Sequence, residues 1–404
     1  MGGGHTCAVT TDGTGYCWGT NELGELGVGG APEVCTVTLY PGRVDSIPCA
    51  TAPLRVAGRQ RWRDIVPGND HTCGLTQDGA AYCWGLDGSG SHRMLGGKAT
   101  KQACNRGVPK YDCSPVPVPV RGSHRFVEIS TGGGHACALT AEGQAYCWGD
   151  AMRGQLGNGS TTSADRPVRV VGELRFRTLA AGNGHTCGIT REERLYCWGS
   201  NLFGELGNGR YGEDTTVPVA VTEGLRFRSV STGTENTCAV TVEGALYCWG
   251  LNASGQLGTA STETCRWGDA SYPCATRPLQ VSGNRTWSAV STRMNVTCGL
   301  SEGRAYCWGE NRQGLLGAAA ADRCQDPAAV ALGKVEPFPC SRAPLPVSGP
   351  DTFRSISTMW SSTCALTPEG RAYCWGANGV GQLGDGSTAR RTEPTPVVQR
   401  LSGE

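Results

Sequence analysis

The 22 cysteines of this 404-residue chain carry its most reactive side chains, and their spacing decides what chemistry they do. Protein thiols form disulfides, bind metals or act as nucleophiles. Fourteen cysteines fall into seven pairs, the first in a fragment such as T-C-A-V-T and the second in Y-C-W-G. These pairs are Cys7 with Cys17, Cys73 with Cys83, Cys137 with Cys147, Cys187 with Cys197, Cys238 with Cys248, Cys298 with Cys307, and Cys364 with Cys374. The other eight pair as Cys35 with Cys49, Cys104 with Cys113, Cys265 with Cys274, and Cys324 with Cys340.

This pairing favours disulfides over two alternatives. Metal binding needs close ligand clusters such as C-x-x-C, and no C-x-x-C occurs. Buried free thiols are common in protein cores, but they would not arrive as matched pairs. Disulfides imply an oxidising compartment, so we expect an extracellular, periplasmic or cell-surface protein, although this chain shows no secretion signal.

Histidines recur beside the first cysteine of each pair and raise the question of a metal site. The position two residues before that cysteine holds His5, His71, His135 and His185 in the first four copies, then Asn236, Val296 and Ser362. Each histidine belongs to a different copy and takes the same place in its own turn. We therefore expect each imidazole to cap its local backbone turn, and we predict neither a metal nor a cofactor.

Motifs for catalysis and signals for nucleic acid or membrane are absent from the sequence. It lacks G-x-S-x-G, H-E-x-x-H and a phosphate-binding loop, so we predict no catalytic residue and no enzyme activity. The net charge of +1, from 36 basic and 35 acidic residues, argues against a nucleic-acid partner. No apolar run is long enough to span a membrane. Arginine supplies 32 of the 36 basic residues, which is typical of a GC-rich bacterial genome.

The cysteine pairs belong to seven copies of one unit, which is clearest from Arg125 onward. Four short runs rich in β-branched and aromatic residues, near 126–129, 137–139, 146–148 and 168–170, alternate with glycine-rich connections. We name these strands a to d. The pattern predicts an all-β, seven-bladed β-propeller with mostly four-stranded antiparallel blades, forming a single domain over residues 1–404.

The register of the b–c hairpin follows from its cysteines. If Cys137 faces Cys147, residues 141–143 form a three-residue loop that ends at Gly143, where the backbone turns left-handed. Copy six is one residue shorter and leaves only Glu302 and Gly303 in its turn. Copy four has Glu193 where glycine is expected, which predicts strain or a different loop.

The unit resembles the RCC1-like repeat family of seven-bladed propellers. The resemblance rests on the motif G-x-x-H-[TA]-C-[AG]-L-T…G-x-x-Y-C-W-G-x-N-x-x-G-[EQ]-L-G, as in residues 182–207, and it covers the whole chain. The family's namesake is a chromatin-bound exchange factor for a small GTPase, and bacterial relatives include a secreted protein inhibitor of β-lactamases. The resemblance implies a disc that binds another protein through one face. The paired cysteines and the lack of a basic tail depart from the nuclear members.

The four extra cysteine pairs lie in insertions between strands c and d, at about 30–52, 99–115, 260–276 and 319–342. In a meander these connections share a face with the a–b turns, so we expect a monomeric protein that binds an unidentified partner protein there. The candidate contact residues are Tyr40, Arg43, Tyr111, Arg266, Trp267, Tyr272 and Phe338, with Trp267 and Tyr111 as exposed anchors. These aromatic residues could instead fill small cores beneath their own loops.

Two further readings stay open at this stage. The propeller could be an enzyme or a carbohydrate-binding protein that uses its central channel, or a purely architectural surface protein. Copy one also begins at strand b, with no counterpart of residues 126–130 before it. We therefore expect the native chain to extend upstream of Met1, unless residues 399–404 supply the innermost strand of blade one.

Overall fold

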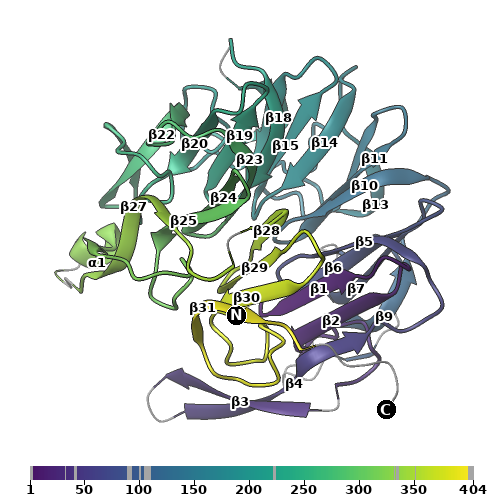
Figure 1. Cartoon of the computed structure of the whole chain (residues 1–404). Helices are drawn as coiled ribbons and strands as arrows, with labels where there is room; N and C mark the ends of the chain where they lie inside the picture. Colours follow the sequence, from purple (N-terminus) through teal and green to yellow (C-terminus); the bar gives the residue numbers. More distant parts are fainter. Residues whose placement is uncertain are drawn as a thin grey trace.

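The computed structural model contains seven antiparallel sheets arranged in a ring, which confirms the predicted seven-bladed propeller (Figure 1). The structure describes residues 3–31, 33–40, 43–88, 93–99, 102–103, 111–221, 224–331, 333, 336–350 and 352–398. Among these residues, no helix has the length and apolar character needed to cross a lipid bilayer.

The strands follow one another around the ring, and each blade is numbered in chain order. Blades 1 and 2 contain β1 (His5–Val9), β2 (Gly15–Thr20), β3 (Glu33–Tyr40), β4 (Arg43–Arg55), then β5 (Trp62–Pro67), β6 (His71–Thr76), β7 (Ala81–Gly88), β8 (Gln102–Ala103) and β9 (Asp112–Pro119). Blades 3 and 4 contain β10 (Phe126–Thr131), β11 (His135–Thr140), β12 (Ala145–Gly149), β13 (Ala164–Arg169), then β14 (Phe176–Ala181), β15 (His185–Thr190), β16 (Leu195–Gly199) and β17 (Thr215–Ala220).

The second half of the ring repeats the same plan. Blade 5 contains β18 (Phe227–Thr232), β19 (Asn236–Thr241), β20 (Leu246–Leu251), β21 (Glu263–Trp267) and β22 (Ala270–Gln280). Blade 6 contains β23 (Trp287–Arg293), β24 (Val296–Ser301), β25 (Arg304–Glu310), β26 (Asp322–Cys324), α1 (Pro327–Ala331) and β27 (Phe338–Pro346). Blade 7 contains β28 (Ser355–Thr358), β29 (Ser362–Leu366), β30 (Ala372–Gly376) and β31 (Arg391–Pro396).

Strand order within the blades explains where the insertions lie. Blade 3 has the order β10-β11-β12-β13, whereas blade 5 has β18-β19-β20-β22-β21, with the inserted strand beyond strand d. The a–b and c–d connections lie at the same end of each antiparallel blade. We call this end of the ring the insertion-bearing face. Blade 1 has the order β1-β2-β4-β3, and β1 is the counterpart of strand b elsewhere. Residues 399–404, the alternative candidate for its inner strand, lie outside the described part of the chain.

Seven disulfides confirm the predicted pairs within the b–c hairpins. Each connects directly opposed residues of strands b and c, with 4.1 Å between Cα atoms. The bonds join Cys7 to Cys17, Cys73 to Cys83, Cys137 to Cys147, Cys187 to Cys197, Cys238 to Cys248, Cys298 to Cys307, and Cys364 to Cys374.

Three further disulfides confirm predicted pairs in the insertions, where they cross the inserted ribbons diagonally with 5.8 Å between Cα atoms. These bonds join Cys35 to Cys49, Cys265 to Cys274, and Cys324 to Cys340. Cys113 is also disulfide-bonded, and its predicted partner Cys104 lies outside the described residues. No described cysteine is free.

The b–c turns adopt the predicted loops. Gly143 has φ 82°, in the left-handed region that glycine tolerates without steric cost. Glu193 keeps the same loop in blade 4 at φ 65°, so the prediction of strain there is confirmed. In blade 6, Ser301 pairs with Arg304 across Glu302 and Gly303, as the shorter spacing predicted.

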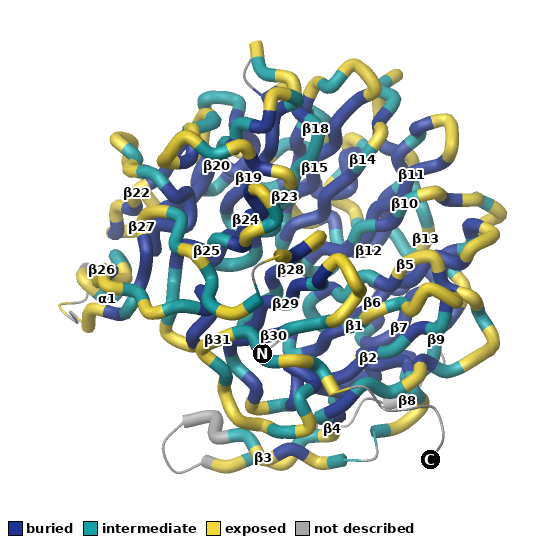
Figure 2. The backbone as a smooth tube through the Cα atoms, in the orientation of Figure 1, coloured by how far each residue is buried: buried dark blue, intermediate teal, exposed yellow. Residues whose placement is uncertain are grey.

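The hydrophobic core lies between neighbouring blades rather than inside any one of them. One cluster joins Cys137, Leu139 and Leu156 of blade 3 to Phe176 and Trp198 of blade 4. Figure 2 shows buried backbone running through the middle strands and exposed backbone at the loops around the edge. Each sheet has two apolar faces, and only a ring of blades covers both of them.

A recurrent hydrogen-bonded contact, which we call the clasp, joins neighbouring blades at six of the seven junctions. In the clasp between blades 3 and 4, the Gln155 carbonyl accepts from Thr186 Oγ1 at 2.9 Å and from Trp198 Nε1 at 2.9 Å. Gln155 belongs to the repeated G-[EQ]-L-G loop, so that loop reaches across to the following blade. The ring closes in the same way, because the Gln382 carbonyl of blade 7 accepts from Thr6 Oγ1 and Trp18 Nε1 of blade 1.

The junction between blades 2 and 3 lacks this clasp. Ala136 stands where the other blades have threonine, and Trp148 Nε1 is buried without a hydrogen-bond partner. Both ring nitrogens of the buried His71 also lack a partner. In the next blade, the equivalent histidine lies 2.8 Å from Thr186 Oγ1.

Replacing Ala136 with threonine should therefore stabilise the protein. The new hydroxyl would give His71 Nε2 the partner that Thr186 gives to His135, and a satisfied buried polar group gains about 1–2 kcal/mol. The expected result is a higher urea midpoint with an unchanged m-value. Ala136→Val is the matched control, because it adds similar volume without the hydroxyl. Equal midpoints for the two variants would contradict the hydrogen-bond argument.

Candidate functional site

Three of the four repeated histidines, all but His71, hydrogen-bond the neighbouring blade, which corrects the expectation that each caps its own turn. His5 Nε2 lies 2.8 Å from Thr72 Oγ1, and His185 Nε2 lies 2.9 Å from Thr237 Oγ1. In blade 5 Asn236 also contacts the next blade, but at another threonine: it donates at 2.8 Å to Thr292 Oγ1 of the inner strand β23. The turn motif from a single copy could not reveal this contact, because the partner is supplied by the next copy.

Burial keeps these imidazoles neutral. It lowers the pKa of His5, His135 and His185 to about 3 and that of His71 to about 4. The charge of Arg293 lowers the pKa of His5, His71 and His135 further. Within the described residues, no three His, Cys, Asp or Glu side chains gather as metal ligands would.

Two buried carboxyl groups occupy the clasp loops. Burial raises the pKa of Glu25 and of Glu205 to about 7, while hydrogen bonds from backbone N–H groups partly offset this rise. Glu25 accepts from Leu23 N at 2.8 Å, and Glu205 accepts from Phe203 N at 2.7 Å. These side chains order their own loops. Neither side chain lines the central channel, and we assign them no catalytic role.

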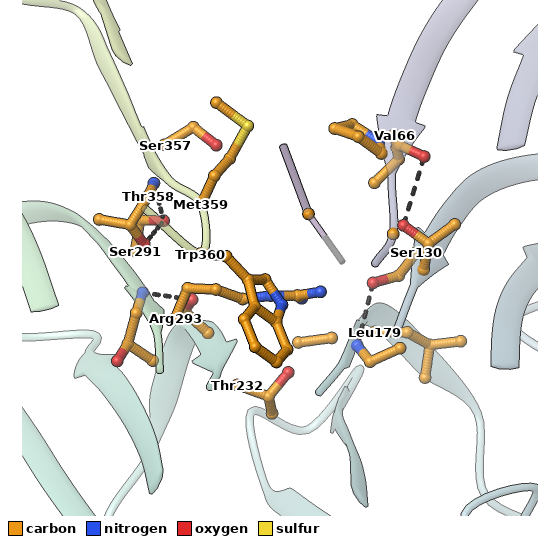
Figure 3. A pocket seen from close by; sticks show the side chains of 18 of the residues that line it. Val66, Ser130, Leu179, Thr232, Ser291, Arg293, Ser357, Thr358, Met359 and Trp360 are labelled. Carbon is orange, nitrogen blue, oxygen red and sulfur yellow. Dashed lines mark hydrogen bonds between the residues drawn. The ribbon is translucent and has the colours of Figure 1, made fainter. Parts of the chain in front are cut away.

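The channel through the middle of the ring contains a cavity of about 260 Å³ (Figure 3). The inner strands supply its wall, with small and hydroxyl-bearing side chains such as Ser130, Thr131, Ser231 and Thr232. Of the described residues that line the cavity, none is Asp, Glu or Lys, and only His5 and Arg293 carry ionisable side chains.

Four side chains from different blades meet in the channel. The Asn69 Oδ1 atom accepts from Arg293 Nη2 at 2.5 Å and from Trp360 Nε1 at 2.6 Å. Asn69 Nδ2 in turn donates to Asn183 Oδ1 at 3.0 Å. Figure 3 shows Arg293 and Trp360 extending into the cavity. Burial lowers the pKa of Arg293 to about 10, so the guanidinium stays charged at neutral pH.

Sequence reasoning missed Arg293 and Trp360, although a signal for both was present. The a–b turns of blades 2 to 5 begin with Gly68, Gly132, Gly182 and Gly233. Blade 6 has Arg293 at this position, and blade 7 has Met359 followed by Trp360. These departures from the repeat mark the residues that line the channel.

The insertions place the predicted contact residues in two different environments. Trp267 ends β21 at the tip of a ribbon and is 58% exposed, while Tyr111 is 51% exposed and Arg266 is also exposed. Tyr272 and Phe338 are buried. Tyr272 packs edge-on against Phe203 with 5.2 Å between ring centres, and the Arg312 guanidinium covers the Phe338 ring at 3.9 Å.

The remaining two predicted contact residues cannot be placed. The side chains of Tyr40 and Arg43 lie outside the described residues, although the backbone of their ribbon, β3 with β4, is described. Figure 1 shows β3 and α1 at the outer edge of the ring. The channel and the ribbons are therefore two separate candidate sites.

Comparison with known proteins identifies the repeat. The chain matches the family model for the RCC1-like domain over residues 1–341, and models for the regulator of chromosome condensation (RCC1) repeat over residues 353–382 and 369–403. It is 29% identical to the ultraviolet-B receptor UVR8 of Arabidopsis thaliana, covering 98% of this chain and 68% of that protein. It is 30% identical to the human E3 ubiquitin-protein ligase HERC2 over 80% of this chain, but spans only 6% of HERC2.

A solved structure shares the fold. The crystal structure of Prp20p from Saccharomyces cerevisiae, described with its binding properties to Gsp1p and histones, superposes with a TM-score of 0.75 at 20% identity. The match covers 97% of this chain and 87% of that one.

Proposed function

The chain belongs to the RCC1-like domain family, and from this premise we propose that it is a secreted or cell-surface scaffold that binds a partner protein through its insertion-bearing face. RCC1-like propellers are mostly non-catalytic scaffolds and often bind proteins. The disulfides support an oxidising location, because such bonds persist outside the cytosol.

The exposure of Trp267 carries the proposal. This side chain is 58% exposed at the tip of a ribbon that the disulfide between Cys265 and Cys274 fastens at its base. Tryptophan is among the residues most enriched at binding hot spots, and a rigid ribbon loses little conformational freedom when it binds. Arg266, its exposed neighbour, adds a second residue type that interfaces favour.

The test is capture of the partner by the oxidised protein from the source organism's extracellular fraction. Substituting Trp267 and Tyr111 together with alanine should remove the partner recovered by the wild type. Because both side chains are exposed, the thermal midpoint should change little. Binding of the purified partner to the wild type, measured by calorimetry, should weaken at least tenfold in the double variant.

Val171→Ala is the matched control. Val171 is 39% exposed in a d–a connection, on the face opposite the insertions, so this variant should retain the partner. Equal capture by the double variant and the wild type would refute the proposed face. A large loss of stability in the double variant would instead identify Trp267 and Tyr111 as packing residues.

A further inference from the structure

We propose that the central channel is a binding site for a small monocarboxylate, held by the guanidinium of Arg293 beside the Trp360 indole. This inference is independent of the proposed function, because it concerns the channel and not the ribbons. It rests on the charge balance of the cavity, on the donors that line it and on the departure of blade 6 from the repeat.

Arg293 brings a positive charge into the channel, and among the described residues it has no acidic partner there. Its guanidinium donates to the neutral Asn69 amide oxygen, and no described residue lining the cavity is acidic. A desolvated cation without a counter-charge is costly, and a bound anion would remove that cost. Arg293 and Trp360 are each partly exposed, so a ligand in the cavity can reach both side chains.

The a–b turn of blade 6 has a different backbone conformation from the other turns, and this conformation accommodates Arg293. In blade 3 a Cβ atom at Gly132 would lie 2.2 Å from the Gly182 carbonyl oxygen, so the ordinary turn has no room for a side chain there. Blade 6 instead pairs Arg293 with Val296 and places Met294 at φ 47°. A non-glycine residue in the left-handed region costs of order 1 kcal/mol, a strain that the turn of blade 6 accepts where it carries Arg293.

Two serine hydroxyls of the wall can donate a hydrogen bond to a ligand. Ser130 Oγ accepts from Ala181 N at 3.0 Å, and Ser231 Oγ accepts from Thr292 N at 3.0 Å. Each of these hydroxyls therefore keeps its own O–H to donate. Asn69 Oδ1, the acceptor nearest to the guanidinium, is already occupied by Arg293 and Trp360.

The volume of the cavity and the single positive charge of Arg293 indicate which class of ligand fits. A guanidinium offers a planar pair of N–H groups that matches a carboxylate, and one cation balances one negative charge rather than the two of a phosphate. A cavity of about 260 Å³ is smaller than the usual site for a drug-sized molecule and suits a small acid. The indole of Trp360 offers an apolar surface to the rest of that acid.

The experiment titrates the oxidised full chain with 4-fluorobenzoate and follows the ligand by ¹⁹F NMR at low ionic strength. The neutral match is 4-fluorobenzamide, and inorganic phosphate is the competitor. The wild type should broaden and shift the benzoate signal but should leave the benzamide signal unchanged. Added phosphate should not displace the bound benzoate. Short peptides with a free or an amidated C-terminus then distinguish a free acid from the carboxylate of a polypeptide.

Arg293→Gly is the decisive variant, because glycine occupies this position in blades 2 to 5. It should weaken benzoate binding at least tenfold while the thermal midpoint stays the same or rises. Arg177→Gln is the charge control: Arg177 donates to the Phe227 carbonyl at 2.7 Å and does not line the cavity, so binding should persist. Equal binding by Arg293→Gly, equal binding of the benzamide, or no carboxylate binding by the wild type would each overturn the proposal.

Discussion

Lowering the pH from 6.5 to 5 should destabilise the folded propeller by about 3 kcal/mol. The four buried histidines have pKa values of about 3 to 4 in the folded state, far below the 6.5 of an exposed imidazole. The unfolded chain therefore binds nearly four histidine protons at pH 5, about half of them taken up between pH 6.5 and 5, whereas the folded protein binds almost none, so acid favours unfolding.

Two buried glutamates oppose this effect without cancelling it. Glu25 and Glu205 have folded-state pKa values near 7, above the 4.5 of an exposed glutamate, so the folded protein holds two protons that the unfolded chain releases. Averaged between pH 6.5 and 5, the unfolded state thus binds about one and a half protons more than the folded state. Each proton is worth about 1.4 kcal/mol per pH unit, which gives the expected loss and a stability maximum near pH 7.

Urea unfolding of the oxidised protein at pH values from 5 to 8 measures this dependence. His185→Asn is the matched variant, because Asn236 in blade 5 also hydrogen-bonds the following blade, through Thr292 Oγ1. It should keep a hydrogen bond to blade 5 and reduce the acid slope by one proton. A slope unchanged by this substitution, or a protein equally stable at pH 5 and pH 6.5, would contradict the assignment.

Reducing the disulfides should unfold the protein at neutral pH. Each hairpin disulfide closes a short loop and stabilises the fold by about 2–3 kcal/mol in the chain-entropy account. The summed stabilisation from the seven hairpin disulfides is as large as or larger than the net free energy of unfolding of an ordinary domain, which is roughly 5–15 kcal/mol. We expect a chain that is reduced in denaturant to stay unfolded when the denaturant is removed under reducing conditions.

Near-ultraviolet circular dichroism, which reports the packing of the eleven tryptophans, is the appropriate measurement. Reoxidation in a glutathione buffer should restore the signal, and this recovery controls for irreversible damage. Single-pair variants separate the two classes of disulfide. Cys238→Ala with Cys248→Ala should cost more stability than Cys265→Ala with Cys274→Ala, because the second pair lies in a peripheral ribbon. A reduced chain with a native spectrum would refute the prediction.

The sequence predicted the features that repeat within one copy. The spacing of Cys137 and Cys147 fixes the hairpin register, and the positions of Gly143 and Glu193 identify the left-handed residue of the turn. Local geometry and the hydrophobic pattern determine both, so a single unit contains enough information. The positions of the strands, the pairing of the cysteines and the number of blades could be predicted from the repeated unit for the same reason.

Contacts between blades were not predictable in this way. The partner of His185 is a threonine 52 residues later, and nothing in one copy indicates how the next is oriented. Burial of Tyr272 depends on Phe203 of the preceding blade. Arg293 was missed for a different reason: an alignment of repeats emphasises what the copies share, whereas a binding site in a symmetric ring arises where one copy departs from the others.

Every described disulfide joins cysteines of the same blade, with sequence separations of 9 to 16 residues. Each bond therefore joins segments that are close in sequence, and it can form as soon as its own segment meets an oxidant, before the later segments have folded. The nearest available thiol is the native partner at every step. Biogenesis of such a cysteine-rich protein requires an oxidant but little reshuffling of wrong bonds by an isomerase.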